Sequence, residues 1–305
     1  MDKIQENLLA EIADLHGVPE GAYNIRSNGV SVQRNCTANI DIETKNDKSG
    51  IDIYIRPGTK NESVHIPVIL DKNGLKEKVY NDFHIGEGAD VVIVAGCGIH
   101  CGGADDMQHD GIHTFYVEKN ARVKYIEKHY GEGDGNGKRV LNPETVIYLA
   151  EGAYMEMEAT QIKGVDSTVR VTKAKVGDNA KLVIHEKIMT HGNQLAKTDF
   201  IVDLDGENSA ANVVSRSVAK DNSKQIFISN IRGNNKCSGH TECDAIIMDN
   251  ANVSAIPEIV AGNVDASLIH EAAIGKIAGE QLVKLMTLGL TEKQAEEQIV
   301  SGFLR

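Results

Sequence analysis

A weak repeat of a turn residue, an alanine and a strand-like segment constrains the fold of this chain more than any other sequence feature. The copies are Gly88-Ala89-Asp90-Val91, Asn120-Ala121-Arg122-Val123, Gly152-Ala153-Tyr154-Met155, Asn179-Ala180-Lys181-Leu182 and Asn250-Ala251-Asn252-Val253. The early copies recur about every 32 residues, a period within the range of solenoids and arrays. A small alanine after Gly or Asn can pack into a tight corner, so that the next strand lies on the preceding coil. The repeat predicts a mainly β fold, a β-solenoid that is most simply a right-handed parallel β-helix.

Short alternating runs fill the chain from about Gly29 to Ile269 and support this prediction. Ile51-Asp52-Ile53-Tyr54-Ile55 is one example, and each run is bounded by Gly, Asn or Asp, as strands joined by tight turns should be. The alternative is a β-sandwich with similar turn spacing. Aromatic residues make up only 4% of the chain and Trp is absent. This composition favours thin stacked layers filled by Val, Ile, Leu and Ala over a sandwich built around large rings.

Helical patterns occur at both ends of the chain. In the N-terminal segment 2–15, apolar side chains have the spacing of one helix face at Ile4, Leu8, Ile12 and Leu15. Near the C-terminus, 280–288 reads as a helix, and Thr291 with Gln294 forms a capping-box pattern that opens a second one. We therefore divide the chain into an N-terminal helical segment (1–28), a β-helix core (29–268) and a C-terminal helical segment (269–305).

The C-terminal helices carry enough apolar residues to form one surface. These residues are Leu282, Leu285, Met286, Ala295, Ile299, Val300 and Phe303. Part of this surface is expected to close the end of the solenoid, because an uncapped coil exposes unpaired backbone. The remainder is a candidate docking surface for a partner protein, and capping alone is the alternative.

Charge and cysteine content narrow the class of protein. The net charge of −12 argues against nucleic-acid binding, which usually needs a basic surface. No apolar run approaches the length of a membrane span, and the N-terminus lacks a basic-then-apolar signal pattern. Five cysteines, an odd number in a large chain, do not resemble a disulfide-stapled secreted scaffold. We therefore expect a cytoplasmic protein.

A first group of soft and borderline metal ligands lies in the N-terminal half. It consists of Cys97, His100, Cys101, His109 and His113, interrupted by Gly102-Gly103. Glycine would let the backbone fold around an ion, so the segment is a candidate metal loop. It does not match a zinc knuckle, and a glycine-rich turn without any ligand is the alternative.

A second group precedes the C-terminal helices and consists of Cys237, His240, Cys243, His270 and Glu271. In a solenoid, residues about one coil apart stack in space, so Cys243 and His270, which are 27 residues apart, could face each other. The alternatives stay open at this point. Cys243 could be a small buried hydrophobe, and His270 could be a helix-entry residue with Glu271 in the first helical turn.

The chain resembles the SufB/SufD family of iron–sulfur cluster assembly proteins. The match is carried by His240-Thr241-Glu242-Cys243-Asp244-Ala245, Ala255-Ile256-Pro257-Glu258-Ile259 and His270-Glu271-Ala272-Ala273-Ile274-Gly275-Lys276-Ile277. It continues through Glu280-Gln281-Leu282, Leu288-Gly289-Leu290-Thr291-Glu292 and Ile299-Val300-Ser301-Gly302-Phe303-Leu304. Weaker similarity extends back to about Gly86.

This resemblance implies a right-handed parallel β-helix that forms a dimer and has no catalytic turnover of its own. It implies that the C-terminal helices bind the ABC-type ATPase SufC, so that Leu282, Leu285, Met286, Ile299 and Phe303 become candidate partner-binding residues. It also implies that Cys243, His270 and Glu271 hold a transient iron–sulfur cluster. Cys97, His100, Cys101, His109, His113, Cys237 and His240 remain further metal candidates, to which the resemblance assigns no role.

The chain also departs from the family pattern. It is shorter than typical SufB or SufD, lacks their longer N-terminal helical region and has no N-terminal multi-cysteine motif. A compact homodimer working with SufC alone is therefore expected, with a sulfur donor protein as a further possible partner. Two other functions compete with the cluster scaffold. One is a structural regulator of the ATPase that holds no cluster, and the other is a β-helix carbohydrate-active enzyme.

Overall fold

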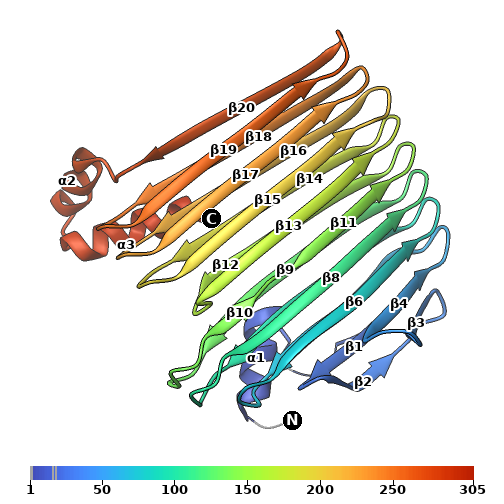
Figure 1. Cartoon of the computed structure of the whole chain (residues 1–305), viewed down its shortest axis with the longest axis horizontal. Helices are drawn as coiled ribbons and strands as arrows, with labels where there is room; N and C mark the ends of the chain where they lie inside the picture. The colour runs from blue at the N-terminus through green and yellow to red at the C-terminus, as the bar shows by residue number, and fades with distance from the viewer. Residues whose placement is uncertain (1–2, 16, 18) are drawn as a thin grey trace.

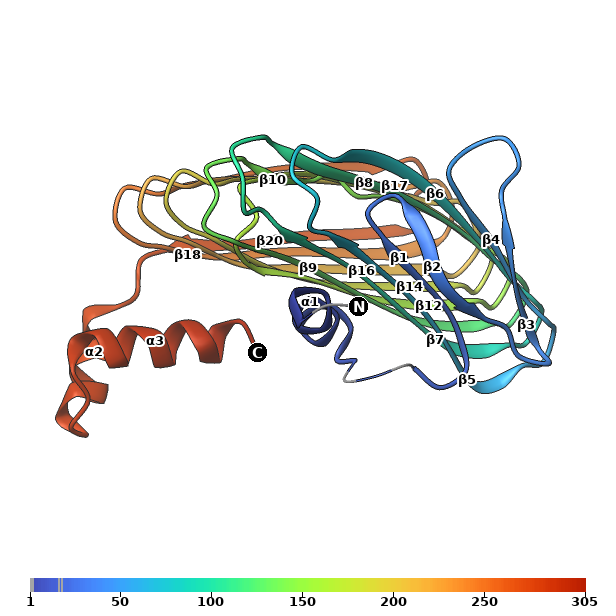
Figure 2. The same cartoon turned by 90° about the horizontal axis from the view of Figure 1, so that it is seen from below.

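The computed structural model describes residues 3–15, 17 and 19–305, which form a β-solenoid with a helix near one terminus and two at the other (Figures 1 and 2). The helices are α1 (Lys3–Ala13), α2 (Gly279–Thr287) and α3 (Glu292–Phe303). In spatial order, sheet A contains β2 (Val30–Asn35), β1 (Ala22–Ser27), β5 (Lys60–Leu70), β7 (Asp90–His100), β9 (Arg122–Glu132), β12 (Tyr154–Lys163), β14 (Lys181–Thr190), β16 (Ser209–Ala219), β18 (Cys237–Ile247) and β20 (Ala266–Gly275). Sheet B contains β19 (Asn252–Ala261), β17 (Lys224–Gly233), β15 (Leu195–Leu204), β13 (Ser167–Val176), β10 (Arg139–Leu141), β8 (Met107–Val117), β6 (Lys76–Ile85), β4 (Gly50–Ile55) and β3 (Ile40–Thr44), with β11 (Glu144–Leu149) also paired to β8 and β13.

From β4 to β20 successive strands alternate between the two sheets, apart from β10 and β11, which both belong to sheet B. Neighbours within a sheet are parallel. Within the described chain, the two exceptions are the antiparallel hairpins β1–β2 and β3–β4 at the N-terminal end of the solenoid. The space between the sheets, called the lumen below, is filled by side chains. This topology confirms the parallel β-solenoid and excludes the β-sandwich.

The backbone register follows the repeat seen in the sequence. Asp90 pairs with Arg122 and Arg122 with Tyr154, so these coils are 32 residues long, whereas Tyr154 pairs with Lys181 and shortens the next coil to 27. The corner residues Gly88, Asn120, Gly152 and Asn179 all have positive φ angles, which Gly and Asn tolerate best. The alanines that follow them, Ala89, Ala121, Ala153 and Ala180, are buried. The corner interpretation is therefore confirmed for four of the five copies. In the fifth, the positive φ angle falls on Asp249, one residue before Asn250, and Ala251 is only half-buried.

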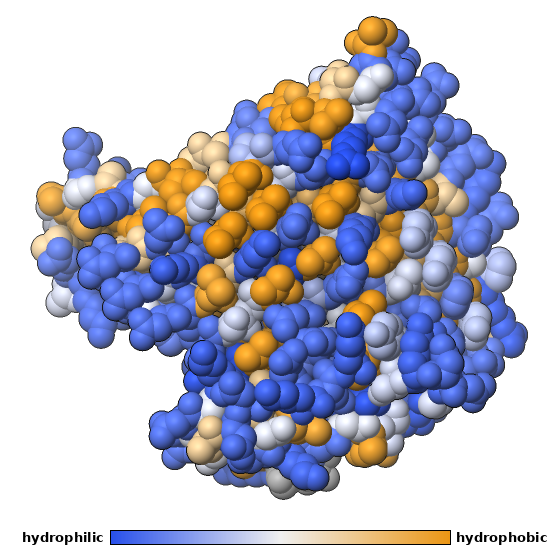
Figure 3. Space-filling view, viewed as in Figure 1, coloured by the Kyte–Doolittle hydropathy of each residue, from blue (hydrophilic) through white to orange (hydrophobic). Residues whose placement is uncertain are grey.

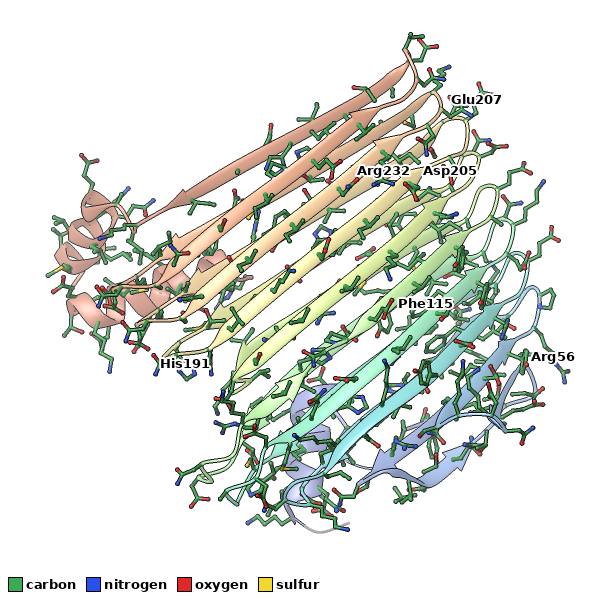
Figure 4. The ribbon with its side chains drawn as sticks, viewed as in Figure 1. Arg56, Phe115, His191, Asp205, Glu207 and Arg232 are labelled. Carbon is green, nitrogen blue, oxygen red and sulfur yellow. The ribbon has the colours of Figure 1, made fainter. Side chains whose placement is uncertain are left out.

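Apolar side chains from both sheets form a long main core in the lumen, and a second, smaller cluster contains Cys97, Ile99 and Met107. Phe83 and Phe115 of neighbouring coils stack with ring centroids 4.4 Å apart, and Figure 4 marks Phe115 on β8. His191 lies at one end of the strands in that figure, whereas Asp205 and Glu207 lie at the opposite end. Polar turns therefore lie at both ends of the strands, on either side of a lumen that runs the length of the solenoid.

Helix α1 covers part of the outer face of sheet A. Its residues Leu8 and Ile12 are fully buried against β7, where Gly96 and Gly98 face outwards. A Cβ atom on Gly96 would lie 2.7 Å from the Ile12 carbonyl oxygen, so the helix can approach this closely only over glycine. The predicted helix is confirmed, although it ends at Ala13, before Leu15.

The C-terminal segment differs from the expected boundaries. Residues 269–275 were expected to begin the helical segment, but they belong to β20, which pairs with β18 along its whole length. The first helix there starts at Gly279, and at the other end β1 lies inside the expected helical segment 1–28. Ladder hydrogen bonds to β18 outweigh the helix propensity of the Glu-Ala-Ala run. His270 is therefore a strand residue and not a helix-entry residue.

The C-terminal helices do not close the solenoid. They form an arm on the outer side of sheet A, the side that α1 also occupies (Figure 2). Lys187 Nζ on β14 donates to the backbone oxygen of Arg305, at the end of this arm, at 2.7 Å. Among the described strands, β19 and β20 each lack a neighbour on one side, and their apolar residues Ile256 and Ile269 are 52% exposed. The expected cap is wrong because the linker after β20 leads the chain beneath the sheet and not across its end.

The described helices include none that is both long and apolar enough to cross a membrane.

Candidate functional site

The residues that carry the family resemblance lie on the last two strands of sheet A, β18 and β20. Strand alternation places Thr241 and Cys243 of β18 on the lumen side, together with His270 and Ala272 of β20. His270 pairs with Thr241, and Cys243 pairs with Ala272, so Cys243 and His270 occupy diagonal positions on the same face. The structure thus places this thiol and this imidazole in one neighbourhood, at the uncovered end of the lumen.

Cys243 is 1% exposed and belongs to the main core. Burial, followed by the nearby carboxylates of Glu186 and Asp244, raises the pKa of its thiol to about 12. The thiol is therefore protonated at neutral pH in the isolated chain. An incoming iron ion would have to displace this proton, since the thiolate is the ligand form.

His270 presents an unsatisfied nitrogen at this end of the lumen. Its Nδ1 is hydrogen-bonded to Oγ1 of Thr241, while its Nε2 is buried and has no partner in the described chain. Burial, with a smaller contribution from His240, lowers the pKa of His270 and keeps the ring neutral. A neutral imidazole with a buried unpaired nitrogen, on the same strand face as a thiol in the diagonal position, offers donor types that suit iron.

Glu271 lies on the opposite face of β20 from His270. Its Oε2 is 3.4 Å from His240 Nε2, and one ligand atom each of His240, Glu242 and Glu271 all lie within 4.8 Å of one another. His240 Nδ1 is 2.9 Å from Oδ1 of Asn212, which directs Nε2 towards the two carboxylates. This outer group could hold a divalent cation. The structure therefore separates Glu271 from Cys243 and His270 and brings it to His240.

Glu242 was missed by the sequence analysis. A hydrogen bond with Asp244, followed by burial, raises the pKa of Glu242, as expected where carboxylates crowd on one surface. The sequence contained a sign of this outer group. His240 and Glu242 are two positions apart, so they share one face of a strand, and Glu271 lies about one coil further along the chain.

Cys237 shares the inner face of β18 with Cys243 but lies at the start of the strand, where it is 6% exposed. Burial raises the pKa of its thiol. It is a core residue at a distance of six positions from Cys243 and does not join the same neighbourhood.

The first ligand group is divided between the two faces of its strands. Cys97 on β7 and His109 and His113 on β8 all point into the lumen. His100 points outwards, where its Nδ1 is 3.1 Å from Glu132 Oε1. Cys101 packs in an apolar cluster with Ile99 and Met107. Only part of the expected loop therefore converges, and it does so on strands rather than in the glycine-rich turn.

A buried ion network in the lumen was also missed. Arg170 on β13 bonds to Glu127 Oε2 through Nη1 and lies 3.5 Å from Glu186 Oε1 through Nε. Glu186 also accepts a hydrogen bond from Ser215 Oγ at 2.8 Å. Burial raises the pKa of Glu186, whereas the charge of Arg170 holds the pKa of buried Glu127 well below its usual range. The network lies among the coils between the Cys97 region and Cys243.

The partner-binding candidates on the arm fall into two sets. Leu282, Leu285, Ile299 and Phe303 are half-buried, and Met286 is exposed. Val283 and Leu288 are exposed beside Met286, at 60% and 76%. The arm therefore presents an apolar surface that nothing in the described chain covers. Val283 and Leu288, which were not among the predicted partner-binding residues, are its most exposed residues.

Comparison with known proteins assigns a family to most of the chain. Residues 78–303 match the family model described as SUF system FeS cluster assembly, SufBD core domain. An iron–sulfur cluster assembly SufBD family protein of Archaeoglobus fulgidus is 32% identical over 85% of this chain and 69% of its own length. Proteins of the same description from Methanocaldococcus jannaschii and Pyrococcus horikoshii are 33% and 27% identical, over 62% and 96% of this chain and 60% and 84% of their own lengths.

Proposed function

The chain belongs to the SufBD family of iron–sulfur cluster assembly proteins, and we propose that it is a scaffold that holds a nascent cluster for a partner ABC-type ATPase. The observation that carries this proposal is the placement of the Cys243 thiol and the unpaired His270 imidazole on one face at the open end of the lumen. The cluster is the cargo of such a scaffold, so an incomplete ligand set favours its release. The protein itself needs no catalytic residue, since ATP hydrolysis belongs to the partner.

A second copy of the chain is the proposed occupant of the open end. Strands β19 and β20 each offer an unpaired edge of ten residues, and Ile256, Ile259 and Ile269 on them are between 42% and 52% exposed. Figure 3 shows hydrophobic side chains gathered over the part of the molecule where the last strands lie. Two copies related by a twofold axis would pair these edges. They would also bring two copies of Cys243 and His270 towards one shared interface.

The α2–α3 arm is the proposed docking site for the ATPase. Its exposed Val283, Met286 and Leu288 form the uncovered apolar surface, and residues 276–278 join it directly to β20. A partner that moves the arm would therefore pull on the strand that carries His270. The five cysteines are all free, which suits a reducing compartment, and we place the protein in the cytoplasm.

Glu271 has a separate role in this proposal. Together with His240 and Glu242 it forms the outer cation group, which we assign to the uptake of ferrous iron and not to the cluster shell. Glu271→Gln should therefore lower ferrous-iron binding to the metal-free protein while leaving the absorbance per cluster unchanged.

Anaerobic reconstitution with ferrous iron and sulfide tests the cluster site. The wild-type chain should gain a labile iron–sulfur chromophore, and Cys243→Ser should lose most of it. Cys237→Ser is the matched control, because it removes another buried thiol from the same face of β18. Equal cluster yield and stability in both variants would show that Cys243 is not a ligand.

Two further measurements test the proposed dimer and the proposed binding of the ATPase. Ile256→Asp should convert a dimer to a monomer in light scattering after gel filtration, and Met286→Asp should abolish co-purification with the ATPase. If the arm variant loses ATPase stimulation, Cys243→Ser keeps it, and the wild-type chain gains no chromophore on reconstitution, the chain is a regulator that holds no cluster.

A further inference from the structure

A groove crosses the outer face of sheet B at the edge where its strands end. Two adjoining hollows of about 290 and 280 Å³ form this groove, and Tyr116 and Glu118 line both of them. Arg56 lines the first hollow and Asp205 the second, and Figure 4 shows these two residues at the same edge of the strands. The groove therefore runs across successive coils, along the axis of the solenoid, and not along one strand.

One wall of the groove is a column of stacked rings. Tyr54, His84, Tyr116 and Tyr148 occupy the same position on four successive coils. Their ring centroids are 4.8, 5.1 and 5.4 Å apart, and neighbouring planes are inclined by no more than 11°. Because each ring covers the face of its neighbour, the column presents ring edges and hydroxyl groups to solvent. The three tyrosines are 39–41% exposed, and their hydroxyls have no hydrogen-bond partner in the described chain.

The opposite wall consists of the residues that follow the strand ends. Gly86, Glu118, Ala150 and Gly177 belong to successive coils, and the backbone N–H of each donates to the coil before it at 2.9–3.0 Å. Gly86, Ala150 and Gly177 have a small side chain or none, so the groove is open beside them. Glu118 lies between these open positions. The groove is therefore two hollows separated by one carboxylate.

The spacing of the two hollows matches that of an extended polypeptide. Gly86 and Ala150 are two coils apart, and neighbouring strands lie about 4.8 Å apart, so the hollows are centred about 9.6 Å from each other. A polyproline II helix rises about 3.1 Å per residue with three residues per turn, so residue i+3 follows residue i after about 9.3 Å. Two side chains three positions apart in such a segment can therefore enter both hollows at once.

The groove also offers the polar contacts that this kind of segment needs. A polyproline II backbone has no internal hydrogen bonds, so its carbonyl oxygens can accept bonds from the tyrosine hydroxyls. Glu118 has no ion pair in the described chain, and its carboxylate lies where a residue between the two inserted side chains would pass. Its charge complements that of a Lys or Arg there, and the net charge of −12 attracts a basic segment as well.

We propose that this groove binds a proline-rich segment of a partner protein in the polyproline II conformation, with a basic residue between two prolines that are three positions apart. Such segments are already extended before they bind, and they dock to grooves lined by aromatic residues. A carbohydrate fits less well, because the stacked rings leave no open ring face as a platform for a sugar. The groove is on the outer face of sheet B, so the inference does not depend on the cluster site or on the arm.

Titration calorimetry of the full-length protein with the blocked peptide Ala-Pro-Pro-Lys-Pro-Pro-Ala tests the proposal. The wild type should bind one peptide per chain. Replacing the four prolines of the peptide with glycine should weaken binding about tenfold or more, because the free peptide becomes flexible. Replacing its lysine with glutamate should weaken binding about fivefold or more, because attraction to Glu118 becomes repulsion.

Variants of the chain locate the binding site. Ala150→Phe should block binding by filling the second hollow. Tyr116→Phe keeps the ring stack but removes one hydroxyl, and it should weaken binding about two- to tenfold. Tyr80→Phe is the matched control, because Tyr80 lies on the same face of β6 as His84 but outside the groove, and this variant should bind like the wild type.

Two results would overturn the proposal at the level of the peptide: a wild-type chain that binds no proline peptide, and one that binds the glycine peptide equally well. Unchanged affinity in folded Ala150→Phe would show that the peptide binds elsewhere and would also overturn it. If that variant does not fold, Tyr116→Phe decides the question, since an affinity equal to that of Tyr80→Phe would exclude the groove.

Discussion

Replacing Arg170 with Met should be among the most destabilising single substitutions in this chain. Arg170 is 2% exposed and lies between two buried carboxylates, with Nη1 bonded to Glu127 and Nε 3.5 Å from Glu186 Oε1. Removing one partner of a buried ion pair leaves an uncompensated charge and costs about 3–5 kcal/mol. An unfolding entropy of about 2.1 cal/mol/K per residue over 305 residues converts this into a fall in Tm of about 5–8 °C.

The assay is thermal unfolding followed by circular dichroism at several pH values. In the variant, Glu127 loses the charge that holds its pKa low, so its pKa in the folded state rises above the unfolded value. The folded variant then binds protons more readily than the unfolded chain, and its deficit relative to wild type should shrink as the pH falls from 7 to 5. Replacing Glu127 and Glu186 with Gln in the same variant should recover most of the loss.

Lys173→Met is the matched control, because Lys173 lies on the same strand but pairs with Glu144 on the surface, at 2.8 Å. Such an exposed pair contributes only about 0–1 kcal/mol, or less than about 2 °C here. If Arg170→Met lowered the Tm no more than Lys173→Met, the reasoning about the buried network would be refuted.

Three other substitutions or treatments have defined outcomes. Gly50→Ala should cost about 1–3 kcal/mol in thermal unfolding, because Gly50 has a φ of +143° and a Cβ atom there would lie 1.7 Å from the Tyr80 carbonyl oxygen; an unchanged Tm would contradict this. Thr291→Ala should destabilise α3 alone by about 0.5–2 kcal/mol through loss of its capping box, seen as faster amide exchange in α3 with an unaltered solenoid. Alkylation of the native protein at pH 7.5 should modify exposed Cys36 and spare Cys243, whose buried thiol has a pKa of about 12, and peptide mapping that finds equal labelling would be inconsistent with this burial.

The coil architecture could be predicted from the sequence because its corners demand particular residues. Asn120 and Gly152 adopt positive φ angles that few other residues tolerate, and the alanine after each must fit inside the corner. These requirements produce a repeat in the sequence, and that repeat can be recognised without knowing which strands pair.

The segment around His270 could not be assigned in the same way. Glu271, Ala272 and Ala273 favour a helix, whereas the pairing with β18 that makes them a strand involves residues a coil away. Once the segment is known to be a strand, alternation alone separates His270 from Glu271. The Glu127–Arg170–Glu186 network was hidden for a related reason. Its members lie in three different strands, and only the stacking of coils brings them together.

The two ends of the solenoid are not equivalent, and this difference limits how far such a molecule can polymerise. At the C-terminal end, β19 and β20 each present ten residues of unpaired edge. At the N-terminal end, the hairpins turn the chain back on itself, and the outermost strands β2 and β3 have only six and five residues and carry Arg34, Asp41 and Glu43. Short charged edges resist further pairing. A chain that can pair only through its C-terminal end can form a dimer but cannot add further copies to make a fibril. This asymmetry protects a fold made almost entirely of stacked strands from unlimited polymerisation.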